Sequence, residues 1–166
     1  MGFVKFMATH KITFNELLNI KERDTGLARM LAGFAWKWIS KKDKQQVDII
    51  IDGIGRQWNT TPTDWVNSES SINEIGSIHC IQGYDLNYGF VILGPDIKYD
   101  VEKKSIYADK NKYFDVNGKK SATPEELTQY IKNIYYVLMT RGIKGTYLYV
   151  CDDDLKTYLK KYVDVI

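Results

Sequence analysis

The chain has 166 residues, 44% of them hydrophobic and 27% charged, which is typical of a single soluble domain with a buried core. Its net charge of +2 gives no global case for nucleic-acid binding, and no apolar run is long enough to cross a bilayer. The two cysteines, Cys80 and Cys151, stand in no metal-ligand spacing, so we expect free thiols, no structural zinc and a cytoplasmic, reducing setting.

The first third of the chain predicts one helix and three strands. A capping box from Thr13 to Glu16 starts the helix, which is expected over residues 14–24 at a lobe boundary. Apolar or β-branched runs of strand length follow at residues 27–36, 47–51 and 54–58. The tight-turn signal Asp52-Gly53 joins the last two runs into a hairpin.

The middle of the chain predicts two core strands and an insertion. Residues 75–81 form an apolar run that predicts a buried strand, and residues 90–93 predict a second strand. Residues 99–114 alternate polar and aromatic side chains, and Asn117-Gly118 is a turn signal. We therefore expect a peripheral hairpin insertion over about residues 96–120.

The last third contains the best-defined helix. Thr123 is an N-cap followed by proline and, three residues later, by Glu126. Apolar residues then repeat at helical spacing as far as Leu138. A strand at residues 146–150 and a helix capped by Asp152 complete the chain. This order predicts one α/β domain over residues 1–166, with a mostly parallel sheet.

Two polar segments are candidates for chemistry. Residues 77–85 predict a strand that runs into a glycine turn, and ligands of open α/β sheets collect at the carboxyl ends of strands. Residues 139–145 place Arg141 between the long helix and the next strand. Neither segment requires a function: the first can be a polar turn after a strand, and the basic residues of the second can complement the dipole at the carboxyl end of the helix. A phosphate contact by the glycine turn and the arginine is the functional alternative.

Together these segments resemble two motifs of superfamily-one helicases. The first reads Ser77-x-His79-x-x-Gln82-Gly83-x-Asp85 and is similar to motif V, Thr-x-His-x-x-Gln-Gly-x-Glu. Residues 138–142 resemble the Leu-Thr-Arg-Ala stretch of motif VI. The tryptophan-rich residues 32–38 look most similar to a bacterial, uncharacterised branch of such ATPases, related to the helicase region of schlafen proteins. The resemblance covers about residues 27–163 and implies the C-terminal RecA-like motor domain, a mostly parallel sheet flanked by helices.

The resemblance also implies roles for six residues. They are Arg141 as arginine finger on the γ-phosphate, Gln82 and Gly83 near the phosphates, Asp85 on the ribose, and Ser77 and His79 facing the nucleic-acid backbone. Ser77 replaces the usual threonine and keeps the hydroxyl. Asp85 replaces glutamate and is one methylene shorter, so its carboxylate reaches less far toward a ribose.

Two parts of an ATP site are missing from this sequence. It has no Gly-x-x-x-x-Gly-Lys-Ser/Thr loop and no strand ending in an Asp-Glu pair, which together hold the phosphates and magnesium. We therefore expect ATP with Mg²⁺ to bind only together with a first RecA-like lobe, in cis or in trans. The chain is then expected to be an excised domain, a truncated product or one subunit of a split motor. Its other expected partner is single-stranded or duplex nucleic acid, with no role for a membrane.

Two further classes of function remain open. The chain is alternatively a stand-alone module that binds nucleic acid or protein without catalysis. A metal-dependent nuclease using Asp48, Asp52 and Glu74 ranks last, because no compact Asp…Glu-x-Lys arrangement is present. A metal at residues 152–154 is less favoured than helix capping by the same aspartates.

Overall fold

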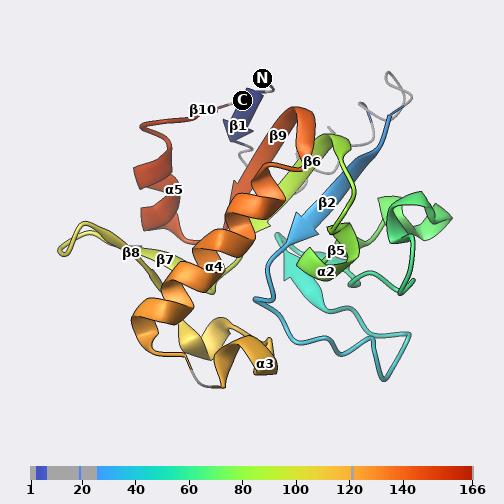
Figure 1. Ribbon diagram of the computed structural model, residues 1–166, viewed down its shortest axis with the longest axis horizontal. Helices are drawn as coiled ribbons and strands as arrows, with labels where there is room; N and C mark the ends of the chain where they lie inside the picture. Colours follow the sequence, from blue (N-terminus) through green and yellow to red (C-terminus); the bar gives the residue numbers. More distant parts are fainter. Residues whose placement is uncertain (1–2, 7–18, 20–25, 121, 166) are drawn as a thin grey trace.

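The structure, a computed structural model, describes residues 3–6, 19, 26–120 and 122–165. Its centre is a six-stranded sheet in the order β10–β1–β9–β6–β2–β5, and every neighbouring pair is parallel (Figure 1). The strands are β1 Phe3–Phe6, β2 Ala28–Ala32, β5 Ile75–Gly76, β6 Leu86–Leu93, β9 Gly142–Val150 and β10 Asp164–Val165. Because all six strands run the same way, their amino ends share one edge of the sheet and their carboxyl ends share the other. The expected α/β fold is confirmed and is consistent with a RecA-like domain.

The side chains of the central strands divide the core into two layers. Leu31, Val91 and Leu148 point to one face, where they pack with the buried sides of the helices. Their neighbours along the strands point to the other face, as the period of two in a strand requires. The helices on the first face are α2 Ile78–Ile81, α4 Pro124–Met139 and α5 Asp153–Leu159, and α4 lies over the central strands, roughly along their direction (Figure 1).

Two antiparallel hairpins flank the sheet, and the Asp52-Gly53 signal correctly predicts the first. The first joins β3 Ile49–Ile51 to β4 Ile54–Arg56 through Asp52 and Gly53, both of which have positive φ. The second joins β7 Ile97–Asp100 to β8 Ser105–Ala108, inside the predicted insertion. The remaining short elements are η1 Trp65–Asn67, η2 Glu69–Ile72, η3 Lys110–Lys112 and α3 Val116–Lys119. The turn predicted at Asn117-Gly118 is wrong, because these residues lie in the short helix α3.

The long helix follows its local signals closely. Thr123 accepts a hydrogen bond from the backbone of Glu126, and the Glu126 carboxylate accepts one from the Thr123 backbone in return. This capping box fixes the first turn of α4. At the other end, the helix stops at Met139, next to the start of β9.

A second prediction is wrong and several are incomplete. The run 75–81 is a strand only at β5, and the chain then turns into the four-residue helix α2. The apolar residues at 75, 78 and 81 are three apart, so after Gly76 they meet the core equally well from a helix. β6 and β9 begin earlier than predicted, because parallel pairing with each other extends both strands. The predicted helix 14–24 lies outside the described residues, apart from residue 19. Among the described residues, no helix has the length and apolarity that a membrane span needs.

A buried carboxyl group ties the insertion to α4. The Tyr135 hydroxyl donates to Asp96 Oδ1 over 2.6 Å and accepts from the Gly94 backbone N–H over 2.9 Å. The second carboxyl oxygen of Asp96 is buried without a hydrogen-bond partner. This burial raises the pKa of Asp96 to about 7, because a charge there is poorly solvated.

We predict that Asp96 makes the protein less stable as the pH rises. Its folded-state pKa of about 7 exceeds the unfolded value, so the folded state holds this proton more tightly. The contribution is fully present below about pH 4 and is lost as the pH rises through about 7. The loss is at most about 4 kcal/mol, since each pKa unit corresponds to about 1.4 kcal/mol.

Urea unfolding between pH 4 and 8 tests this prediction with Asp96→Asn as the comparison. The variant lacks the titrating group, so its free energy of unfolding should fall less over this range than that of the parent protein. Parallel pH profiles for the two proteins would contradict the assignment.

Candidate functional site

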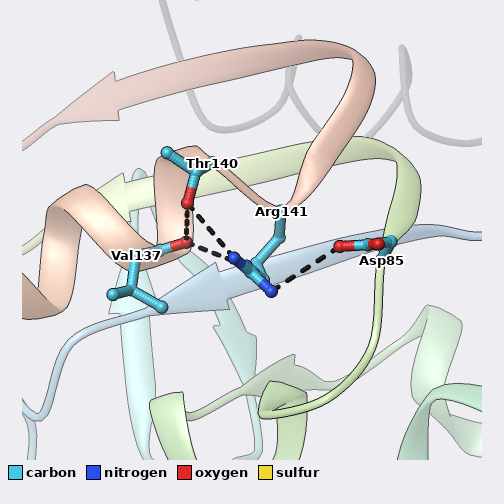
Figure 2. Close-up of polar contacts among 4 residues, drawn as sticks. All are labelled: Asp85, Val137, Thr140 and Arg141. Atoms are coloured by element: carbon cyan, nitrogen blue, oxygen red, sulfur yellow. Dashed lines mark hydrogen bonds and ion pairs between the residues drawn. The ribbon is translucent and has the colours of Figure 1, made fainter.

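Two motif-like segments far apart in sequence meet at the amino edge of the sheet. Asp85 directly precedes β6, and Arg141 directly precedes β9, the neighbouring strand. The Leu86 backbone N–H donates to the Arg141 carbonyl oxygen over 2.8 Å, which joins the two segments at the main chain. Figure 2 shows the two charged side chains facing each other across this junction.

The guanidinium of Arg141 is held at the surface by three long contacts. Its Nη1 lies 3.6 Å from Asp85 Oδ1. Its Nε donates to the Val137 carbonyl over 3.2 Å, and Nη2 donates to the Thr140 hydroxyl over 3.4 Å (Figure 2). Charge-assisted hydrogen bonds are usually about 2.7–2.9 Å long, so none of the three is strong. With 26% of the Arg141 side chain and 64% of the Asp85 side chain exposed, the ion pair is not an internal one.

The backbone next to Arg141 leaves little freedom in where the side chain starts. A Cβ on Gly142 would lie 2.2 Å from the Gly145 carbonyl oxygen and 2.8 Å from the Gly89 nitrogen. Only glycine therefore lets β9 begin this close to β6. The Thr146 hydroxyl also donates to the Met139 carbonyl over 2.8 Å, which closes the end of α4 onto β9.

The glycine turn lies at the amino edge as well, which corrects our expectation that it follows a strand at the carboxyl edge. Helix α2 intervenes and carries the chain back, so that Gln82 and Gly83 come just before Asp85 and β6. Gly83 has φ +83°, and both Gln82 and Gly83 are exposed. No atom comes within 4 Å of the position a Gly83 Cβ would take, so the backbone of this turn faces open space.

Tyr84 anchors this turn to a neighbouring loop. Its hydroxyl donates to Asp64 Oδ1 over 3.0 Å, and this hydrogen bond raises the pKa of Tyr84. Its backbone N–H donates to the Ile81 carbonyl at the end of α2. The turn is thus fixed on both sides of Gly83 while its backbone stays exposed.

Ser77 and His79 belong to the opposite edge of the sheet. Both follow the carboxyl end of β5, one just before α2 and the other in its first turn. Ser77 is buried, with only 2% of its surface exposed, and its backbone N–H donates to the Asn59 side chain. His79 is exposed, and its ring centre lies 5.5 Å from that of Phe34. The six predicted site residues therefore form two groups, four at the amino edge and two at the carboxyl edge, connected by α2.

An aromatic pocket beside His79 was not among the predicted sites. Its volume is about 260 Å³ and its main lining residues, which define the aromatic pocket below, are Phe34, Trp36, Trp38, Lys41, His79 and Phe114. The interleaving of aromatic and lysine residues over 34–38 is a local signal that could have indicated it. No local signal brings in Phe114, which reaches this place because its backbone N–H bonds the Phe34 carbonyl.

The carboxylates considered for a nuclease have structural partners. Asp48 accepts hydrogen bonds from Ser40 and from the backbone of Trp58. Glu74 accepts from Thr60 and from the indole N–H of Trp65. No group of three His, Cys, Asp or Glu side chains that could hold a metal is found within the described part of the chain.

Two other candidate groups also serve the fold. Asp152 caps α5 through the Leu155 backbone N–H, as predicted. Burial raises the pKa of the Cys80 thiol to about 12, so this cysteine is not an activated nucleophile beside His79.

Comparison with known proteins identifies the family. Residues 6–152 match the family model described as schlafen group 3, DNA/RNA helicase domain. The chain belongs to this family. The Saccharomyces cerevisiae protein YPL245W, named as uncharacterized, is 34% identical over 153 residues, which are 87% of this chain and 34% of the yeast protein. The chain therefore spans about a third of the length of that yeast relative. No solved structure is significantly similar to the chain. The helicase-like expectation is confirmed, whereas the bacterial branch and the second-lobe assignment stay predictions.

We predict that Asp85→Asn leaves this schlafen-type domain almost as stable as the parent protein. The ion pair with Arg141 is long and solvent-exposed, and such pairs contribute about 0–1 kcal/mol. The free energy of unfolding in urea should therefore change by less than about 1 kcal/mol. A drop of several kcal/mol would show that the pair holds the fold together and does not serve a site.

Proposed function

We propose that this schlafen-type domain is the second motor lobe of a helicase-like ATPase. In this function Arg141 contacts the γ-phosphate of an ATP held by a first RecA-like lobe, and residues near α2 contact nucleic acid. The observation that supports the proposal most is the meeting of Arg141 with Asp85, beside the exposed Gly83 turn. The family match to a DNA/RNA helicase domain supports the same class of function.

The residues present fit the phosphate end of ATP. Arg141 offers a planar fork of N–H donors that suits a phosphoryl group, and its contacts are weak enough to exchange. The exposed backbone of Gly83 allows a phosphate to approach closely. The described residues hold no cluster of three acidic, histidine or cysteine side chains placed to hold a metal ion, and we assign Mg²⁺ and the phosphate-binding loop to the first lobe.

The chemistry follows from where charge develops. In hydrolysis, a water oxygen bonds to the γ-phosphorus while the bond to the β–γ bridging oxygen breaks, giving ADP and inorganic phosphate. Bound ATP supplies the phosphoric anhydride bond that breaks. Arg141 stabilises the negative charge on the equatorial oxygens in the transition state. In this proposal, Asp85 accepts a hydrogen bond from the ribose once Arg141 has turned to the phosphate.

Binding without catalysis is the second candidate, and the aromatic pocket with exposed His79 favours it. The two candidates differ in what Arg141 does. In a pure binding module, its removal has no effect on any turnover. In the motor lobe, its removal abolishes turnover in the presence of the first lobe and leaves nucleic-acid contacts at the other edge unchanged.

We predict that the purified chain alone does not hydrolyse ATP. When the chain is combined with a lobe of the family that carries the phosphate-binding loop, in cis or in trans, nucleic-acid-stimulated phosphate release should appear. Arg141→Ala should then lower kcat by about 10³-fold or more, the typical effect of losing an arginine finger. Arg141→Lys is the matched control, because it keeps the charge without the fork and should restore only part of the rate.

Two results would contradict this function. One is ATP turnover by the isolated chain that persists after rigorous purification and is abolished by Arg141→Ala. The other is an assembled enzyme whose kcat is the same with arginine and with alanine at position 141.

A further inference from the structure

We propose that the aromatic pocket binds one unpaired nucleobase by stacking, as part of a single-stranded nucleic-acid path along the carboxyl edge of the sheet. This inference rests on the nucleic-acid half of the proposed function and is independent of the ATP half. It adds to the motif residue His79 a set of aromatic and lysine side chains from outside the two motifs.

The aromatic rings of the pocket are partly exposed and are not fully buried in the hydrophobic core. Phe34, Trp36 and Trp38 are half-buried, whereas the other two tryptophans of the chain, Trp58 and Trp65, are completely buried. Phe34 and Trp38 rest on Trp58, with ring centres 5.6 Å and 6.0 Å from its ring. A buried ring thus supports two partly exposed ones and keeps them rigid.

The pocket has the size for one planar group. Its volume of about 260 Å³ is below the roughly 300–1,000 Å³ of pockets for drug-sized molecules. A nucleobase is flat and apolar on its faces, so it fits between aromatic side chains. Paired bases already stack on each other inside a duplex, which leaves only unpaired bases free to insert.

Cations stand around the pocket where a sugar-phosphate backbone would pass. Lys41 Nζ lies 5.4 Å from the centre of the Trp38 ring, and Lys37 Nζ lies 5.9 Å from the centre of the Phe114 ring. Both lysines are exposed, as is His79. Aromatic faces combined with a basic rim are the usual arrangement for unpaired strands.

The acidic group that lines the pocket does not cancel this charge complementarity. Asp115 accepts weak hydrogen bonds from the Tyr113 hydroxyl and the Gly118 backbone N–H, each at 3.5 Å. Its carboxylate is thereby directed in part toward its own loop. The two lysines, Lys37 and Lys41, then outnumber the one carboxylate beside the proposed strand.

Intrinsic fluorescence tests the proposal on the unmodified protein. Since Trp58 and Trp65 are buried, a stacked base quenches only Trp36 and Trp38. A short thymidine DNA oligonucleotide or a uridine RNA oligonucleotide should quench the signal, and an abasic strand of equal length and charge should not. Comparing the DNA and RNA arms shows which source of the base the pocket prefers. Equal quenching and equal affinity for the normal and abasic strands would overturn the proposal.

Substitution provides the second test. Phe34 and Trp38 rest on the buried Trp58, so we choose Trp36, a partly exposed ring of the pocket, for the substitution Trp36→Ala. It should weaken oligonucleotide binding about tenfold or more, measured by fluorescence anisotropy at fixed salt. Tyr136→Ala, which removes an exposed aromatic ring on α4, is the matched control and should bind like the parent. If Trp36→Ala fails to fold, the abasic comparison still decides.

The failure of this inference is distinguishable from failure of the motor function. Arg141→Ala should bind the oligonucleotide as the parent does, because Arg141 lies at the opposite edge of the sheet. If oligonucleotide binding depends on the bases but Arg141→Ala does not change ATP turnover by the two assembled lobes, the pocket is supported and the motor function is contradicted. An Arg141-dependent ATPase with base-independent strand binding would overturn the pocket alone.

Discussion

The parallel pairing of β6 with β9 is the constraint on which the site depends. Arg141 and Asp85 are neighbours only because these two strands lie side by side and begin at the same edge. The main-chain hydrogen bond between Leu86 and Arg141 extends that pairing one residue beyond the strands. The absence of a side chain at Gly142 permits it, since a Cβ there would overlap the backbones of both strands. A change in the register of β6 against β9 would separate Arg141 from Asp85 even though neither residue had been substituted.

Helix α2 connects the two edges of the sheet at which the candidate site residues lie. A typical crossover between parallel strands returns the chain to the amino edge through a longer helix. Here four helical residues and the Gly83 turn are enough, because β5 is only two residues long. His79 at the start of α2 borders the aromatic pocket, and Asp85 after its end pairs with Arg141. A shift of this short segment would be felt at both edges, which is the arrangement a domain needs if nucleic acid and nucleotide are to influence each other.

The sequence predicts those features that depend on neighbouring residues. The capping box at Thr123 and the helical repeat after it locate α4 almost to the residue, and Asp52-Gly53 locates the first hairpin. The motif pair correctly indicates which segments meet. It does not indicate the edge, because that depends on whether residues 78–81 continue a strand or turn back as a helix. The apolar spacing there suits both. Phe114 shows the other limit, since it joins the pocket through a backbone bond to a residue eighty positions earlier.

The weakness of the Arg141–Asp85 pair suits the function proposed for it. Breaking a buried ion pair leaves an uncompensated charge and costs several kcal/mol, so an arginine held in that way resists release. A solvent-exposed pair at 3.6 Å contributes about 1 kcal/mol or less, and a phosphoryl group offering a bidentate contact competes for the guanidinium easily. The contact with Asp85 therefore orients the guanidinium of Arg141 without holding it tightly. Two features keep the ion pair weak: the exposure of the Asp85 carboxylate and the 3.6 Å distance between the two charged groups. A shorter or more buried pair would orient Arg141 more firmly, but a phosphoryl group would then compete less well for the guanidinium.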